Sequence, residues 1–464
     1  MTAMATARVD ATSELVPRLV RIFLNVFCCT LAGYVLLGRS FAYLGFPPLY
    51  IGEITLALGI AAALTYGNLI SAILTFPGLA LALLMVWTAF RTIPYWNTYG
   101  LDAPRDAMIV FYGMFSYIIA SLILRRPATL TILIERYKRF IPCVIFLAPI
   151  TPIVAYSSGD PILWTLGSSS LTGAKVVDVC CHLTAVLAFS LVGFVRMRFL
   201  VLIIILLVEL FGSSQERQAM LVFVVGCSIA AVFSPKRHAL RNVLAIVGVL
   251  AVIVGTLAAV DFRIPGQNPS RTADVRHLVI NATNVFSNSG SERGDVTREW
   301  RLNWWSDIMD YTVRGPYFWN GRGFGANLAD TDGYQTNASD SGEPVLRSPH
   351  NANMTILARG GVPALFLWVA ALGSWLVAVV KQLIKARQLQ DDLWTGLFTF
   401  LLTYWMIILI SGSVDVALEG PVLGIWFWTI HGVGLAALIL HRHRVTTMLG
   451  PKAGVGVTGY PTNP

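Results

Sequence analysis

The sequence predicts an all-α protein that crosses a membrane about twelve times and carries one large loop outside it. Of the 464 residues, 55% are hydrophobic and 13% are charged, whereas soluble domains average about 25% charged residues. Apolar runs of about 17 to 25 residues recur along the chain, and each is long enough to cross a hydrocarbon core about 30 Å thick. A transmembrane barrel would instead show short alternating strands.

The apolar runs define the spans in chain order. They cover residues 18–37, 50–66, 70–90, 107–124, 140–156, 176–195, 199–212, 217–234, 242–260, 362–380, 393–411 and 422–440.

Basic residues in the connections predict the orientation, because cytoplasmic loops carry an excess of lysine and arginine. With the N-terminus inside, alternate connections are basic, and omitting any one span would break this alternation. The inner cations are Arg125, Arg126, Arg136, Lys138, Arg139, Arg196, Arg198, Lys236, Arg237, Arg241, Lys381, Lys385, Arg387, Arg442 and Arg444. The short connection 412–421 falls outside and is acidic.

This orientation divides the chain into four parts. Residues 1–260 form a bundle of nine spans, 261–361 an outer loop, 362–441 three further spans, and 442–464 a cytoplasmic tail. The loop is far longer than ordinary connections, and in a double-membrane bacterium it lies in the periplasm. Within it, residues 297–313 place apolar side chains at helical spacing, which predicts an amphipathic helix on the membrane or on the bundle.

Other protein classes fit the sequence less well. The net charge of +9 falls in clusters between spans, which is typical of topology signals rather than of nucleic-acid binding. The six cysteines lie in or beside apolar runs and form no disulfide or metal-ligand spacing. Asp330 and Asp332 faintly resemble a calcium loop but lack its other ligands, so neither a metal nor another cofactor is expected. A transporter would show internal repeats and charges near the membrane midplane.

Most ionisable residues of the spans lie near outer ends, and Arg217 is the strongest functional candidate among them. It lies in the tight outer hairpin between spans seven and eight, where a guanidinium could bind phosphate oxygens bidentately. The alternative is a structural pair with Glu209 or Glu216. Asp178 and His182 share a helix face, as a functional pair or as a structural contact.

The outer loop supplies the remaining candidates. Arg301 and Trp305 are four residues apart and face the same side of the predicted helix. The glycine-rich stretch 321–325 could let backbone approach a ligand, or could be an ordinary turn. His350 stands where the loop enters span ten and could accept a proton near neutral pH. Asn351 could cap that helix or orient the ring, and the alternative for His350 is a buried structural histidine.

These pieces together resemble the O-antigen ligase and O-antigen polymerase superfamily of bacterial membrane glycosyltransferases. The shared features are about twelve spans, a long outer loop late in the chain and an Arg four residues before a Trp. The matching residues are Arg217 at the end of a Ser-x-x-Arg-like element, Arg301, Trp305, Pro316, Gly321-Arg322-Gly323, His350-Asn351 and Gly360. Residues 317–320 make a longer link than the family has, and Arg298 competes with Arg301 for the family arginine.

The resemblance implies an enzyme of the bacterial inner membrane whose active site faces the periplasm. Its donor would be a glycan on undecaprenyl diphosphate, and its acceptor a sugar hydroxyl on lipid A–core (ligase) or on a lipid-linked glycan (polymerase). His350 would be the base, Arg217 and Arg301 would bind the diphosphate, and transfer would invert the anomeric carbon without a metal. The supporting residues would be Asn351, Arg347, Arg322 and Trp305.

Overall fold

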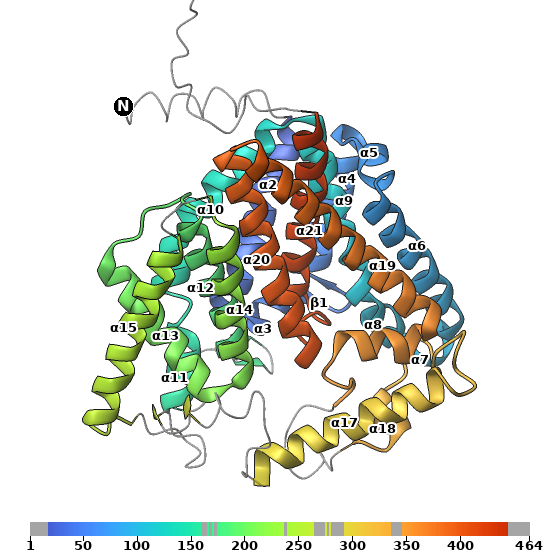
Figure 1. The fold of residues 1–464 in the computed structure, drawn as a ribbon. Helices are drawn as coiled ribbons and strands as arrows, with labels where there is room; N and C mark the ends of the chain where they lie inside the picture. Colours follow the sequence, from blue (N-terminus) through green and yellow to red (C-terminus); the bar gives the residue numbers. More distant parts are fainter. Residues whose placement is uncertain are drawn as a thin grey trace, which may run out of the picture.

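The computed structural model describes residues 17–158, 165–166, 169–170, 174–235, 239–263, 274–275, 278–279, 292–335 and 346–443. Nearly all regular structure in these residues is helical (Figure 1). The helices are α2 Arg18–Leu37, α3 Arg39–Ala42, α4 Ile51–Tyr66, α5 Leu69–Ile73, α6 Phe76–Thr92, η1 Ile93–Tyr95, α7 Trp96–Tyr99, α8 Asp102–Phe111, α9 Met114–Arg125, α10 Ala128–Phe146, α11 Ile150–Ser158, α12 Val176–Leu191, α13 Phe199–Gln215, α14 Arg217–Phe233, α15 Ala239–Ala259, α17 Glu292–Thr312, α18 Leu328–Asp332, α19 Ala352–Gln388, α20 Asp392–Val414 and α21 Pro421–Arg442. Two small antiparallel hairpins pair β1 Gly45–Phe46 with β2 Leu49–Tyr50 and β3 Thr165–Leu166 with β4 Ser169–Ser170.

The all-α class and the multi-pass membrane architecture are confirmed. Within the described residues, seven helical segments are long and apolar enough to cross a membrane, and five further apolar helices are shorter. The seven are Arg18–Leu37, Phe76–Tyr99, Asp102–Arg125, Ala128–Val154, Ala352–Gln388, Asp392–Val414 and Pro421–Arg442. Each of the twelve predicted spans overlaps one of these helices, while the number that crosses the bilayer stays a prediction.

Several predicted spans differ in detail from the helices. Span three begins in α5 and continues in α6, because Thr75 caps a new helix whose first turn contains Pro77. Spans four and five are likewise built from two helices each, α8 with α9 and α10 with α11. The helix of span ten begins at Ala352 rather than 362, and it kinks at Gly361.

The core is centred on α21, which packs against α9, α20, α19 and α2. Its tryptophans lie among other buried aromatic rings, and Trp428 packs edge-on against Trp368. Two of the buried indole N–H groups here donate to main-chain carbonyls, which satisfies them in an apolar surrounding. Trp428 Nε1 donates to Ile109 O at 3.1 Å, and Trp375 Nε1 donates to His431 O at 2.9 Å.

The described part of the long loop forms a small layer at one end of the bundle, where α17 and α18 lie in Figure 1. The helix predicted at 297–313 is confirmed as part of α17, which packs on α19. Its buried tryptophan is Trp304, next to a half-buried Trp305. Trp304 and Ile308 pack with Leu357 and Ala358 on the first turns of α19.

The kink at Gly361 is held by the glycine-rich stretch 321–325. Gly361 has φ +74°, and Pro363 lacks an N–H, so the carbonyls before the kink lose helical partners. Arg322 N donates to Ala358 O at 2.7 Å, and Gly323 N donates to Arg359 O at 2.9 Å. The glycine backbones predicted as a possible ligand contact therefore approach the main chain of α19.

Candidate functional site

The site lies at the C-terminal end of α20, around Asp415. This residue follows α20 directly and opens the short connection to α21. Asp415 Oδ1 lies 3.0 Å from His350 Nδ1, and Asp415 Oδ2 lies 2.5 Å from Lys175 Nζ. The three residues come from the start of α12, the end of the long loop and the end of α20. An imidazole, a carboxylate and an ammonium thus form a chain.

The backbone around His350 is fixed on both sides. His350 has φ +53°, a left-handed conformation that few non-glycine residues adopt. Before it, Trp305 Nε1 donates to Pro349 O at 2.8 Å. After it, the Asn351 side chain caps α19 by accepting from Asn353 N and Met354 N. The predicted cap is confirmed, and both neighbours hold the imidazole in one place.

The electrostatics of Asp415 favour a carboxylate. Burial alone would raise its pKa, but the hydrogen bond with His350 and the charge of Lys175 outweigh burial and lower the pKa below its usual range. An ionised Asp415 accepts from Nδ1–H, so the proton of a neutral His350 stays on Nδ1. The His350 side chain is 25% exposed, which leaves Nε2 as the nitrogen able to accept a proton from a substrate.

Two further hydrogen bonds join the first turn of α19, directly after His350, to residues 413–419. Thr355 Oγ1 donates to Glu419 Oε1 at 2.7 Å, and Asn353 Nδ2 donates to Ser413 Oγ at 3.3 Å. Burial raises the pKa of Glu419, against hydrogen bonds from Ser348 and Thr355 that lower it. The start of α19 and residues 413–419 therefore form one interlocked unit.

Arg301 reaches this unit from α17. Its Nη1 donates to Val414 O at 2.9 Å, one residue before Asp415. Burial lowers the pKa of Arg301, and the charges of Asp415 and Glu216 raise it. The guanidinium thus lies near both carboxylates, and its Nε is buried without a partner among the described residues.

Arg217 is the first residue of α14. Its neighbour Gln218 donates through Nε2 to Ser411 Oγ at 2.5 Å, which fixes this helix end against the end of α20. Arg217 is half-buried, and its side chain makes no hydrogen bond or ion pair with any residue that the structure describes. The positive end of the α14 dipole adds to its charge.

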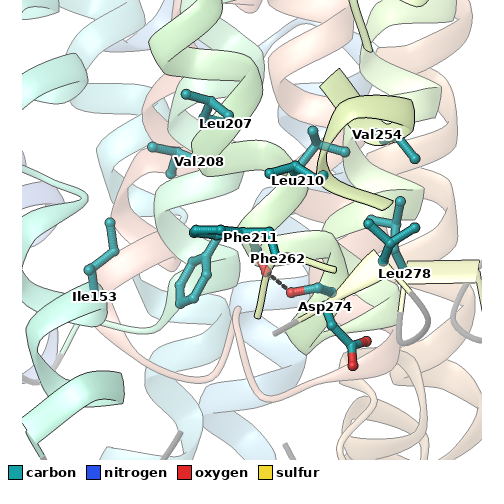
Figure 2. Close-up of a pocket in the computed structure, with 12 residues that line it drawn as sticks. Ile153, Leu207, Val208, Leu210, Phe211, Val254, Phe262, Asp274 and Leu278 are labelled. Atoms are coloured by element: carbon teal, nitrogen blue, oxygen red, sulfur yellow. Dashed lines mark hydrogen bonds between the residues drawn. The ribbon is translucent and has the colours of Figure 1, made fainter. Parts of the chain in front are cut away.

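An apolar hollow of about 320 Å³ lies against α13 (Figure 2). It follows the second half of α13 from Leu207 to Ser214, three residues before Arg217. Its other walls come from α11, α15 and the stretch after α15, with Ile153, Val254 and Phe262 among the labelled residues. Nearly the whole lining is hydrocarbon.

Two of the predicted supporting arginines lie in other ion pairs. Arg322 Nη2 is 3.0 Å from Asp332, and its guanidinium covers the ring of Tyr311 at 4.3 Å. Arg347 binds Asp102 and Asp106 on α8 at 3.2 and 3.0 Å. These contacts give both residues a role in anchoring the layer that contains α17 and α18.

Two other residues that the sequence suggested as pairs have different partners in the structure. His182 Nδ1 lies 2.5 Å from Tyr404 Oη rather than against Asp178. Glu209, one possible partner of Arg217, accepts instead from Thr184 Oγ1 at 2.9 Å. Neither histidine nor glutamate reaches the Asp415 cluster through these contacts.

Sequence reasoning omitted Asp415, Lys175 and Gln218 from the site. Asp415 was visible only as an acid in a short outer connection, 65 residues from His350. Lys175 is 240 residues from its partner. No local spacing links such residues. Their predicted position on the same side of the membrane was the one signal in the sequence that could have grouped them.

Comparison with known proteins gives one match. Residues 199–369 match the model of a protein family described as O-antigen ligase. No curated protein matches the chain. The matched range contains Arg217, Arg301 and His350. This match supports membership of the chain in the O-antigen ligase and polymerase superfamily.

Proposed function

We propose that this protein transfers a glycan from undecaprenyl diphosphate to a sugar hydroxyl at the periplasmic face of the inner membrane. The observation that carries the proposal is the His350–Asp415 pair, which lies on the same unit as the guanidinium of Arg301. A positioned base beside fixed positive charge suits a reaction in which a hydroxyl attacks and a diphosphate leaves.

In the proposed step, His350 Nε2 accepts the proton of the acceptor hydroxyl while its oxygen bonds to the anomeric carbon. The bond from that carbon to the diphosphate oxygen breaks, and its electron pair leaves with undecaprenyl diphosphate. Arg217 and Arg301 stabilise the developing negative charge, and Asp415 stabilises the imidazolium that forms. Single displacement inverts the anomeric carbon and uses no metal.

The apolar hollow supports a lipid-linked donor. A carrier whose diphosphate lies at Arg217 needs a hydrocarbon surface for its first isoprene units, and the hollow offers one along α13. Arg301 then approaches the same diphosphate from the water-facing side. Membrane lipids and the carrier are the expected surroundings of this face.

Replacing His350 with alanine tests the base. The variant should reach the membrane in normal amount and lose transfer, with a fall in rate of about 10²-fold or more. Full activity in His350→Ala would contradict the assignment.

The acceptor separates the ligase from the polymerase. In a strain lacking the gene, bare lipid A–core on a lipopolysaccharide gel, with long glycan accumulating on its carrier, identifies a ligase. Core capped by a single repeat, or loss of long exopolysaccharide with intact lipopolysaccharide, identifies a polymerase. An unchanged glycan profile and unchanged carrier pools would contradict both.

A further inference from the structure

A second hollow lies at the opposite end of the bundle from α17 and α18, where α4 and α9 end and α5 begins. Its volume is about 420 Å³. The lining consists of Thr65, Tyr66, Gly67, Asn68, Arg125 and Arg126. Two of these six residues are cations and none is a carboxylate, so the hollow favours an anion.

The two arginines differ from Arg136, another cation of the predicted inner connections, in their side-chain contacts. Neither the Arg125 side chain nor the Arg126 side chain makes a hydrogen bond or ion pair with any described residue. Arg136, in contrast, donates to Leu24 O at 2.7 Å and to Asn25 Oδ1 at 2.6 Å. Both guanidiniums of the hollow are therefore available to a ligand.

The floor of the hollow is rigid. Asn68 N donates to Ser121 O on α9 at 3.1 Å. A Cβ added at Gly67 would stand 2.6 Å from Ser121 Oγ, so the chain passes α9 with no spare room. The side-chain Oδ1 of Asn68 caps α5 by accepting from Ser71 N, which leaves the side-chain N–H₂ of this lining residue as a donor.

Exposed hydrocarbon surrounds this polar hollow. Leu64 and Ile70 are 70% and 71% exposed, and Leu74 and Phe76 are 74% and 70% exposed. In a membrane protein such side chains mark the surface that meets lipid tails. A ligand here therefore meets two cations at its head and an apolar surface alongside, which is the chemistry of a phospholipid.

We propose that this hollow binds the headgroup of an anionic phospholipid of the inner leaflet. The phosphate lies between Arg125 and Arg126, and the acyl chains cover Leu64 and Ile70. Basic pockets between helices on the cytoplasmic side are suited to such lipids. The site is separate from the transferase site, and its existence does not depend on the proposed function.

The test is lipid-dependent stability of the purified full-length protein in detergent. Phosphatidylglycerol should raise Tm by a few degrees, and phosphatidylcholine should not. Arg125→Gln/Arg126→Gln should abolish the rise. The control Arg196→Gln/Arg198→Gln removes the same charge from the exposed connection between α12 and α13. This control should keep the rise in Tm with phosphatidylglycerol.

Native mass spectrometry gives a second readout that does not depend on Tm. The wild type and the control should retain one more phosphatidylglycerol than Arg125→Gln/Arg126→Gln. Equal retention by all three proteins would overturn the proposal. An equal rise in Tm with phosphatidylcholine, or an equal loss of response in both double variants, would overturn it as well.

Discussion

His350 has a backbone conformation that costs about 1–2 kcal/mol for most residues. The hydrogen bond of Trp305 to Pro349, the Asn351 cap and the contact with Asp415 hold it there. Strain of this kind is often found at functional sites, where it preorganises a reactive group. At this residue the contact of Nδ1 with Asp415 fixes which ring nitrogen faces away from the carboxylate.

Asp415→Asn should reduce the rate of transfer by about 10²- to 10⁴-fold with little change in KM for the donor. An amide does not stabilise the imidazolium, and its N–H₂ can stabilise the wrong tautomer of His350. The measurement is transfer in membranes that contain equal amounts of each protein. Asp310→Asn, at a half-exposed carboxylate of α17, is the control, and wild-type activity in Asp415→Asn would remove Asp415 from the mechanism.

The lowered pKa of Asp415 predicts how stability depends on pH. A carboxyl whose pKa is lower in the folded state stabilises that state fully above its ordinary pKa, near 4, and loses this effect as pH falls toward the lowered value. The Tm difference between the wild type and Asp415→Asn should be constant from pH 8 to about 5 and shrink below about 4. A difference that already shrinks between pH 8 and 6 would disagree with this assignment.

At the residue scale, the sequence identified side chains whose role shows in local spacing. Asn351 is one residue before a helix, so its cap was readable, and Arg301 and Trp305 are one turn apart. Asp415 and Lys175 meet His350 only through the packing of α12, α19 and α20. Such contacts need the folded bundle.

At the scale of the helix, Gly321 and the kink in α19 depend on each other. Gly321 has φ +55°, and an added Cβ would stand 2.4 Å from the main-chain carbon of Arg359. The main chain at Gly321 and at Arg359 is held by hydrogen bonds, so neither segment can move away easily.

Gly321→Ala should therefore destabilise the protein by more than about 2 kcal/mol, seen as a lower Tm and weaker expression. Gly373→Ala, on α19 itself, is the control, because a Cβ there meets nothing within 4 Å. It should be neutral or slightly stabilising. Equal effects of the two substitutions would show that the contact with α19 is unimportant.

Apolar stretches could be predicted from the sequence because hydropathy reports the lipid environment. The points where one such stretch divides into two helices were harder to predict. A stretch such as 70–90 is apolar throughout, yet it divides where Thr75 and Pro77 begin a helix. The early start of α19 was missed because its first turns, from Ala352 to Gly360, pack against α17 rather than lipid. Hydropathy alone does not distinguish these two surroundings.

At the scale of the whole molecule, the orientation predicted from the basic residues places α17 outside the membrane and the α12–α13 connection inside. Leu302→Cys, on an exposed part of α17, should react with a membrane-impermeant maleimide in cells whose outer membrane is permeabilised. Arg196→Cys should react only after lysis. The wild type, with its six native cysteines, gives the background. Reaction of Arg196→Cys in unlysed cells would reverse the orientation.

The order of the site residues along the chain also has a consequence for biosynthesis. Lys175, Arg217, Arg301 and His350 leave the ribosome before Asp415, which follows α20 and is separated from the last helix by a short connection. A growing chain therefore lacks the carboxylate that joins these groups until eleven of its twelve predicted spans have been made. On the proposed function, a growing chain that has not reached Asp415 cannot remove glycans from their carrier, so activity begins only after α20 has been made.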